Sequence, residues 1–276
     1  MKIFYSIEEY INLKINVNHY IPTMGNLHDG HMSLIKNSKK NYNKVCLSIF
    51  INEKQFNNKK DFSLYPRTLE EDIKKLKKLK VDYLLIPNKK DIENFSSSFD
   101  KKLEPKKLTT DLCGKYRPGH FLAVIDIIHR FIQIIQPKKI VLGEKDYQQL
   151  IVIKELIKIY NHKVKVVSLQ TVRDKDGLAL SSRNNLLSID EKKSASDIYK
   201  ALLFAKKLFI NKVPIDKIYK EMHKFFEKSP IKLQYFAIRN FKLLQCECDN
   251  ALIAFIACYL GKVRLIDNII LKPSTI

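Results

Sequence analysis

The sequence predicts an α/β protein with a doubly wound parallel sheet, followed by a smaller C-terminal α+β domain. Short β-rich runs alternate with helix-length segments through the first two thirds of the chain, which is typical of βαβ units. The run 45–51 is almost wholly apolar, as expected for a strand that helices cover on both faces. After about residue 180 this alternation ends. We therefore expect two domains, 1–179 and 180–276.

The expected elements follow from hydrophobic spacing and from turn residues. In the first domain we expect strands over 19–24, 44–51, 81–87, 139–143 and 163–172, and helices over 30–40, 69–80, 121–135 and 147–160. In the second domain we expect helices over 189–211 and 215–228, and strands over 234–239, 251–259 and 263–271. The segment 88–110, rich in Lys, Ser and Asn, is expected to be a long surface loop.

The chain carries a large positive charge, with 50 Lys and Arg against 29 Asp and Glu in 276 residues, for a formal net charge of +21. Such a balance can mark a nucleic-acid-binding protein. The lysines are spread along the whole chain, however. In the expected helix 69–80 they fill the face opposite the apolar residues, as on a solvated amphipathic helix. We therefore expect no nucleic-acid partner.

The sequence lacks the features of a secreted or membrane protein. The longest apolar run, 251–260, is too short to span a bilayer, and the first ten residues lack a signal-peptide layout. The five cysteines are scattered and lack zinc-type spacing, which favours reduced thiols; they are Cys46, Cys113, Cys246, Cys248 and Cys258. We expect a cytoplasmic protein with no membrane partner.

The segment 21–31 contains the strongest candidate site. His28 and His31 bracket Asp29 and Gly30 at the point where an expected strand gives way to an expected helix. Glycine lets backbone approach a ligand closely, the first turn of a helix offers N–H groups to phosphate, and imidazoles add further donors. In a doubly wound sheet, ligands bind beyond the carboxyl ends of the strands, where this motif lies. Taken alone, the pattern is also compatible with a structural turn.

Two further segments follow expected strands. Gln55 comes after the second strand, where its amide offers both a donor and an acceptor to a hydroxyl or carboxylate; a plain loop glutamine is the alternative. The segment 143–149 runs from a strand into a helix. Lys145 can neutralise phosphate, and Gln149 lies one helical turn further on a similar face. A helix start with a surface lysine is the alternative here.

The segment 173–184 begins with a turn signal and ends in Ser181-Ser182-Arg183. Hydroxyls, backbone N–H groups and a guanidinium together can bind phosphate, and a mobile loop of this kind can close over a nucleotide. A domain-junction loop with an N-cap serine is the alternative. The turn 116–121 is expected to have a structural or interface role. Of the remaining histidines, we expect His129 to be packed in the interior, and His162 and His223 to be exposed.

Eight motifs, in order along the chain, resemble those of the pantoate–β-alanine ligase family. They are 22–31, 48–52, 65–68, 117–121, 143–150, 176–179, 181–184 and 264–268. One of them alone would say little, whereas eight in family order that extend nearly from end to end are specific.

The resemblance implies an ATP-dependent ligase with a Rossmann-like domain for ATP and pantoate (1–179) and a smaller lid domain (180–276). In this family the carboxylate of (R)-pantoate attacks the α-phosphate of ATP, which releases pyrophosphate and leaves pantoyl adenylate. The amine of β-alanine then attacks the acyl carbon, giving pantothenate and AMP. Mg²⁺ accompanies the triphosphate, with no protein ligands assigned to it. A homodimer is implied by the resemblance alone.

The resemblance also implies roles for individual residues. The catalytic residues would be His28, His31, Lys145 and Arg183. His31 occupies the position of the family's proton donor, but we interpret it mainly as a phosphate stabiliser, because a carboxylate nucleophile has no proton to lose. Gln55 and Gln149 would bind pantoate, and Gln55 also β-alanine. The ATP site would comprise Met24, Gly25, Asn26, Leu27, His28, Asp29, Gly30, His31, Gly143, Glu144, Lys145, Asp146, Val172, Leu180, Ser181, Ser182 and Arg183.

The sequence departs from the family pattern at three positions. Glu53 and Lys54 stand where Pro and a small or apolar residue are usual, which puts the charge near the pantoate loop in doubt. Ala123 stands where Gly is usual, which raises the question of a crowded helix contact.

Two alternative functions fit the sequence less well, because Gln55 and Gln149 are neutral amides and the lysines are dispersed along the chain. A nucleotidylyltransferase shares the His-x-Gly-His pattern but needs a basic acceptor site where Gln55 and Gln149 stand. A nucleic-acid-binding module needs clustered basic residues with interleaved aromatics.

Overall fold

The computed structural model describes residues 1–243 and 252–272, which form two compact units. Unit 1 comprises Met1–Glu144 and Gln149–Gln170, and unit 2 comprises Lys145–Gln148 together with the described part of Thr171–Ile276. The helix that begins at Tyr147 therefore starts in unit 2 and continues in unit 1. The domain boundary expected at 179/180 stays a prediction.

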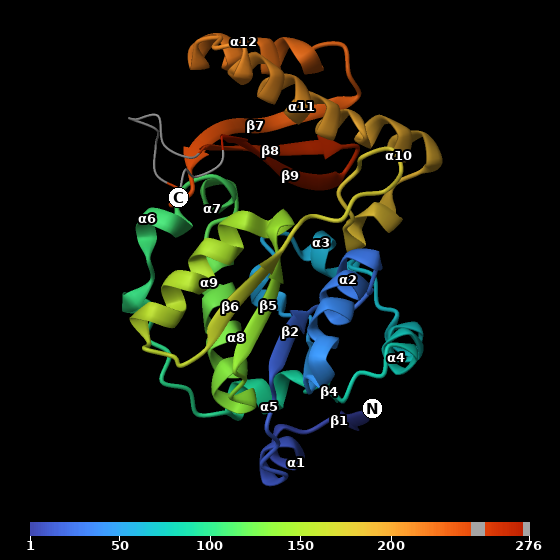
Figure 1. Ribbon diagram of the computed structural model, residues 1–276, viewed down its shortest axis with the longest axis vertical. Helices are drawn as coiled ribbons and strands as arrows, with labels where there is room; N and C mark the ends of the chain where they lie inside the picture. Colours follow the sequence, from blue (N-terminus) through green and yellow to red (C-terminus); the bar gives the residue numbers. More distant parts are fainter. Residues whose placement is uncertain (244–251, 273–276) are drawn as a thin grey trace. The chain divides into compact units, whose positions relative to one another are not determined.

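Unit 1 is built on a six-stranded sheet in which every pair of neighbouring strands is parallel (Figure 1). The strand order is β1 (Lys2–Phe4), β4 (Tyr83–Leu85), β3 (Val45–Ile49), β2 (His19–Thr23), β5 (Lys139–Gly143) and β6 (Lys165–Leu169). From β2 the chain moves outward through β3 and β4, then returns to the other side of β2 to form β5 and β6. The predicted doubly wound fold is confirmed, and the order of strands reverses between β2 and β5.

Helices cover both faces of this sheet. Successive residues of a strand point to opposite sides, so neighbouring residues of one strand pack against different helices. Ile21 packs in a buried cluster with Ile35 of α2 (Asp29–Ser38) and Leu76 of α4 (Leu69–Lys78). Its neighbour Tyr20 instead meets Phe131 of α8, with ring centroids 5.9 Å apart. The other helices of the unit are α1 (Ile7–Asn12), α3 (Lys59–Ser63), α5 (Lys89–Asn94), α6 (Lys106–Thr109), α7 (Cys113–Tyr116), α8 (His120–Ile135) and most of α9 (Tyr147–Ile159).

The prediction of a long surface loop over 88–110 was wrong. The segment contains α5, a 3-10 turn at Lys101–Leu103 and α6. Asn88 caps α5 by accepting a hydrogen bond from the backbone N–H of Asp91, and Asp100 caps the 3-10 turn through the N–H of Lys102. The segment shows no clear helical period in its sequence. Its short helices are stabilised by polar side chains that cap their first turns.

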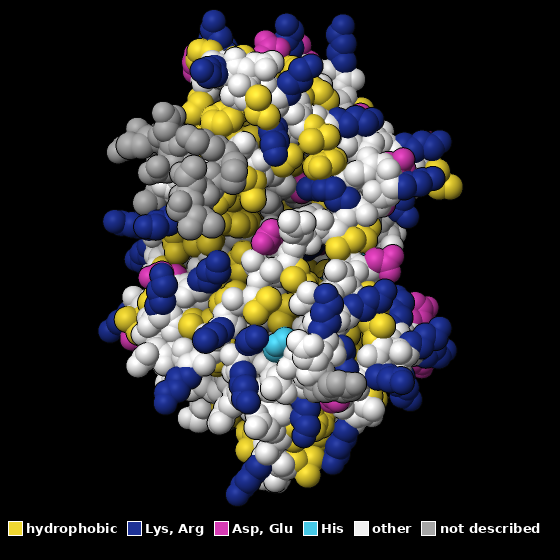
Figure 2. Space-filling view, in the orientation of Figure 1, with side chains coloured by type: hydrophobic (Ala, Val, Ile, Leu, Met, Phe, Trp, Pro, Cys, Tyr) yellow, Lys and Arg dark blue, Asp and Glu magenta, His cyan; other side chains and the backbone are white. Residues whose placement is uncertain are grey.

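Lysine and arginine side chains are spread over the face of the molecule that Figure 2 shows. Within residues 1–243 and 252–272, no helix is both long and apolar enough to cross a bilayer. Cys46, Cys113 and Cys258 are buried free thiols, and burial raises the pKa of Cys46 and of Cys258 to about 12. Cys246 and Cys248 lie outside the described residues.

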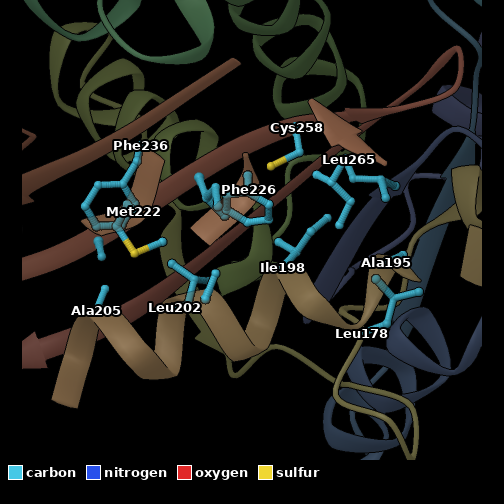
Figure 3. Close-up of a cluster of buried hydrophobic side chains, with 14 of the residues drawn as sticks. Leu178, Ala195, Ile198, Leu202, Ala205, Met222, Phe226, Phe236, Cys258 and Leu265 are labelled. Atoms are coloured by element: carbon cyan, nitrogen blue, oxygen red, sulfur yellow. The ribbon is translucent and has the colours of Figure 1, made fainter. Parts of the chain in front are cut away.

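Unit 2 has helices α10 (Ile189–Ala195), α11 (Asp197–Ile210) and α12 (Ile215–Phe226) and an antiparallel sheet in the order β7 (Ile231–Asn240), β8 (Leu252–Leu260) and β9 (Val263–Lys272). Apolar side chains of α11 and α12 pack against one face of this sheet (Figure 3). Ile198 and Met222 represent the helices in this core, and Phe236 and Cys258 the strands. The predicted smaller α+β fold is confirmed, and the helix expected over 189–211 is interrupted at Ser196, which ends α10 and precedes α11.

A pair of histidines lies in unit 1. His129 is buried as expected, but His162 is half-buried rather than exposed, and its Nε2 is 2.9 Å from Nδ1 of His129. The other ring nitrogen of His129 lies 3.1 Å from the hydroxyl of Ser98. Burial and the neighbouring His162 lower the pKa of His129 to about 4, and burial lowers the pKa of His162.

These pKa shifts predict a loss of stability in mild acid. As pH falls from about 6.5, the ordinary histidine pKa, towards 4, the unfolded chain binds protons that folded His129 and His162 do not. Stability from the pair is therefore full above pH 6.5 and is lost towards pH 4. We expect the melting temperature to fall less steeply over this range in His129→Gln than in wild type, while exposed His223→Gln keeps the wild-type slope. Equal slopes in all three proteins would contradict this account.

Candidate active site

Three expected site segments of unit 1 lie at the same edge of its sheet. Strands β3, β2 and β5 are adjacent and parallel, so their carboxyl ends lie side by side. Met24–Asp29 follows β2, Asn52–Gln55 follows β3, and Gly143 ends β5 with Glu144 directly after it. This edge flanks the reversal in strand order, where doubly wound sheets bind their ligands.

The two histidines of the first segment cap α2 with their rings. Nδ1 of His28 accepts a hydrogen bond from the backbone N–H of Gly30 (3.2 Å), and Nδ1 of His31 accepts from the backbone N–H of His28 (3.3 Å). Because both Nδ1 atoms accept, each neutral ring carries its proton on Nε2. The ring centroids are 4.1 Å apart, so two Nε2–H donors are held close together at the start of a helix.

The backbone before these histidines is held by a buried carboxylate of α4. Oδ2 and Oδ1 of Asp72 accept hydrogen bonds from the backbone N–H groups of Asn26 and Leu27, both at 2.8 Å. Lys75 donates to the carbonyl of Leu27 (2.7 Å). Gly25 and Asn26 have positive φ angles of 79° and 48°, and a Cβ at Gly25 would come within 3.2 Å of Asp72 Oδ2. The carboxylate thus fixes a turn that glycine makes possible.

Sequence reasoning missed Asp72 as a support of the candidate site, because α4 was expected to be only a solvated amphipathic helix. Asp72 is completely buried, and burial raises the pKa of its carboxyl, while the N–H donors and Lys75 act in the opposite direction. The feature of the sequence that could have identified Asp72 is its position in the helix. Asp72 lies three residues after Leu69 and four before Leu76, on the apolar stripe of the helix.

Gln55 ends a 3-10 turn, η2 (Glu53–Gln55), and its side chain is half-buried. Its carbonyl accepts hydrogen bonds from Arg117 Nη2 (3.0 Å) and His120 Nδ1 (2.9 Å). The turn 116–121, for which a structural or interface role was expected, therefore contacts the backbone of a residue that is predicted to bind substrate.

The three departures from the family pattern lie near this turn. The Glu53 carboxylate forms an exposed ion pair with Lys89 (3.0 Å), and Lys54 is exposed. Ala123 is buried, and its carbonyl accepts a hydrogen bond from the Asn52 side chain (3.1 Å). The contact between α8 and η2 thus forms with alanine at this position.

Lys145 and Asp146 belong to unit 2, where two residues of β9 contact the predicted site segments. Asn268 donates to the carbonyl of Lys145 (2.9 Å), and the Lys145 ammonium lies 3.6 Å from the Asp146 carboxylate. Asp267 forms a bidentate ion pair with Arg173 (2.5 and 3.0 Å) at the base of the predicted phosphate loop. Burial raises the pKa of the Asp267 carboxyl, against the opposite effect of Arg173.

The loop 172–184 has a defined backbone in unit 2. The N–H of Leu180 donates to the carbonyl of Val172 (3.0 Å), and Arg173 and Ala179 form a β-bridge between them. Ser181 caps a 3-10 turn (Ser182–Leu186) by accepting from the N–H of Arg183 (3.3 Å). The N-cap serine considered in the sequence is therefore present, beside the basic side chain of the predicted phosphate clamp.

The predicted site residues thus divide between the two units. Unit 1 holds Met24–His31, Gln55, Gly143, Glu144 and Gln149; unit 2 holds Lys145, Asp146, Val172 and Leu180–Arg183. The doubly wound sheet with a helix N-terminus and paired imidazoles at its switch point defines a Rossmann-like nucleotide-binding protein.

Comparison with known proteins identifies the family. The pantoate-beta-alanine ligase family model matches residues 6–270. Pantothenate synthetases of Wigglesworthia glossinidia brevipalpis and Marinomonas sp. (strain MWYL1) are 42% and 38% identical, each over 91% of this chain and 90% of the relative. The chain belongs to the pantoate–β-alanine ligase family, whose members are AMP-forming ligases that make pantothenate.

Solved structures agree with this assignment. The crystal structure of pantothenate synthetase from Thermus thermophilus has a TM-score of 0.91 and 32% identity, covering 99% of this chain and 100% of that chain. A Francisella tularensis pantoate-beta-alanine ligase structure, complexed with beta-gamma ATP and beta-alanine, has a TM-score of 0.81 and 34% identity, covering 98% of each chain.

We predict that Asp72→Asn weakens ATP binding by distorting the turn before α2. An amide oxygen can replace only one carboxylate oxygen as acceptor, so one charge-assisted bond is lost, and such bonds contribute about 1.5–3 kcal/mol. We expect KM for ATP to rise about tenfold or more in steady-state assays, with a lower melting temperature. Glu71→Gln, an exposed neighbour on α4, is the control and should retain the wild-type KM. An unchanged KM in Asp72→Asn would contradict the assigned role.

Proposed function

We propose that this chain joins (R)-pantoate to β-alanine through a pantoyl-adenylate intermediate, with the predicted site residues in the roles that the family resemblance implies. The observation that carries the proposal is the pair of imidazoles that cap α2 with their Nδ1 atoms and thereby carry their protons on Nε2. Two N–H donors beside a helix N-terminus suit a polyphosphate.

ATP would bind along the carboxyl edge of the sheet in unit 1. Residues Met24–His31 would supply backbone and imidazole donors to the phosphates. Gly143 and Glu144 would line the same nucleotide site. Among the residues that the structure describes, a Cβ at Gly143 would meet no atom within 4 Å, so their packing does not explain the glycine, and close approach of the nucleotide would. The family resemblance assigns further ATP-binding roles to residues of unit 2, namely Lys145, Asp146, Val172 and Leu180–Arg183.

The acid substrate would be held by Gln55 and Gln149, and β-alanine by Gln55. Both glutamines are half-buried, and each amide can donate to a carboxylate and accept from a hydroxyl. A nucleotidylyltransferase, the alternative on a similar fold, transfers a nucleotide to a phosphate and would need cations at these positions. Two neutral amides fit pantoate better.

The first step would form a bond between a pantoate carboxylate oxygen and the α-phosphorus, and would break the bond from that phosphorus to the pyrophosphate oxygen. Negative charge grows on the leaving pyrophosphate. His28, His31, Lys145 and Arg183 would stabilise this charge, which is the main requirement of phosphoryl-type transfer. In the second step the β-alanine nitrogen attacks the acyl carbon, loses a proton, and AMP leaves with the bonding electrons.

We further propose that ATP enters as its magnesium complex. Mg²⁺ usually keeps several waters and binds through one or two carboxylates and the substrate phosphates. Among the residues that the structure describes, no three His, Cys, Asp or Glu side chains cluster as a metal cage, which suits a metal that arrives with its nucleotide. A homodimer and a cytoplasmic location complete the proposal; buried free thiols fit a reducing compartment.

Product analysis tests the proposed reaction. We expect continuous turnover of ATP to AMP, pyrophosphate and pantothenate only when both pantoate and β-alanine are present. His31→Ala and Lys145→Ala should each lower kcat at least about a hundredfold, the usual scale for loss of a preorganised charge stabiliser. The exposed-histidine variant His223→Ala serves as the matched control and should keep wild-type turnover. Pyrophosphate release that depends on a phosphorylated acceptor would support the nucleotidylyltransferase instead, and near-wild-type rates in both variants would refute the assigned roles.

A further inference from the structure

The backbone carbonyl of Gln55 accepts hydrogen bonds from two side chains of unit 1 that lie far from it in the sequence. Arg117 Nη2 and His120 Nδ1 both point to this oxygen, at 3.0 and 2.9 Å. Arg117 Nη1 lies 3.1 Å from the second ring nitrogen of His120, Nε2. The carbonyl, the guanidinium and the imidazole therefore form a closed triangle of hydrogen bonds.

The triangle fixes the protonation of His120. A carbonyl oxygen can only accept, so His120 Nδ1 must carry a proton and donate it. Arginine can only donate, so His120 Nε2 must be the unprotonated acceptor. The geometry thus selects the neutral Nδ1–H tautomer, and Arg117 holds this tautomer in place. His120 is buried, with 9% of its surface exposed, so this polar network has little competition from water.

Two further bonds tie the same loop to the same helix start. Asn52, before Gln55, donates to the carbonyl of Ala123 (3.1 Å), and Asn57, after it, donates to the carbonyl of Pro118 (2.7 Å). Most residues of helix α8 are buried, so the helix is a rigid support for the loop that contains Gln55. The backbone of Gln55 is therefore fixed from both sides, and its side chain is projected from a defined point.

We propose that Arg117 and His120 are positioning residues that set the affinity of this site for its hydroxy-acid substrate by holding the Gln55 backbone. The inference rests on the proposed role of Gln55 in binding pantoate. Neither residue needs to touch the substrate, since each reaches the predicted substrate-binding residue through a hydrogen bond to the Gln55 carbonyl. Small displacements of a substrate-binding group are costly, about a hundredfold for 1 Å. The segment 117–121, one of the eight family-like motifs, then has a chemical reason for its composition.

Substitutions at His120 test this inference through KM values for each substrate. His120→Ala removes one donor from the Gln55 carbonyl, and we expect KM for pantoate to rise about 10- to 100-fold, with KM for ATP within about twofold of wild type because the nucleotide segments keep their own supports. His120→Asn, whose amide nitrogen replaces Nδ1, should recover much of the loss. Lys54→Gln, an exposed change in the same 3-10 turn, is the control and should leave every KM unchanged.

A double-mutant cycle shows whether His120 acts through Gln55. Gln55→Ala should raise KM for pantoate, and adding His120→Ala to it should change KM by less than about twofold, because the displaced side chain is already gone. If His120→Ala does not fold, Arg117→Met carries the same test, since it removes the other donor to the same carbonyl.

The outcomes separate this inference from the proposed function. A raised KM in Gln55→Ala but not in His120→Ala, or equal rises for ATP and pantoate in His120→Ala, would overturn the positioning role alone. Fully additive effects in the double mutant would overturn it as well. An unchanged KM for pantoate in Gln55→Ala would show that the proposed role of Gln55 is wrong, and the inference would fall with it.

Discussion

The site of unit 1 depends on the buried carboxylate of Asp72. Its two oxygens accept the backbone N–H groups of Asn26 and Leu27, which lie between β2 and α2 and so outside the hydrogen-bond ladder of either element. The turn that results, with positive φ at Gly25 and Asn26, leads directly into the histidine-capped start of α2. Burying a charge is costly unless it is fully paired, and here two N–H donors and nearby Lys75 offset part of that cost, although burial still raises the pKa of the carboxyl. Asp72 thus fixes the turn that leads into the start of α2, where the two imidazoles are held by their own bonds to the helix backbone.

Side chains also hydrogen-bond to the backbone of other predicted site segments. Arg117 and His120 hold the carbonyl of Gln55, and Asn268 holds the carbonyl of Lys145. In each case a side chain distant in sequence satisfies a backbone group beyond a strand end, where the sheet ladder no longer does so. Fixing the backbone leaves the proposed functional side chain available for substrate, and it removes much of the entropy that binding would otherwise have to overcome.

Sequence reasoning succeeded where the pattern is local. Long apolar runs and their turn residues predicted β2, β3 and β5 and the motifs after them, and helical spacing predicted α4 and α8. It missed β1 and α1, because three to six residues contain too little of a period, and it mistook capped short helices for loop in 88–110. The supporting contacts were beyond its reach. Asp72 lies 46 residues from Asn26, and His120 lies 65 residues from Gln55, so no local rule pairs them. The polar residue on the apolar stripe of α4 was the one available signal.

The central claim is that the chain activates pantoate as an adenylate before β-alanine reacts. Exchange of labelled pyrophosphate into ATP measures this step directly, because only a reversible first step returns the label to ATP. We expect exchange that requires pantoate and proceeds without β-alanine. Absence of exchange until β-alanine is added, or exchange that requires a phosphorylated acceptor in place of pantoate, would contradict the account.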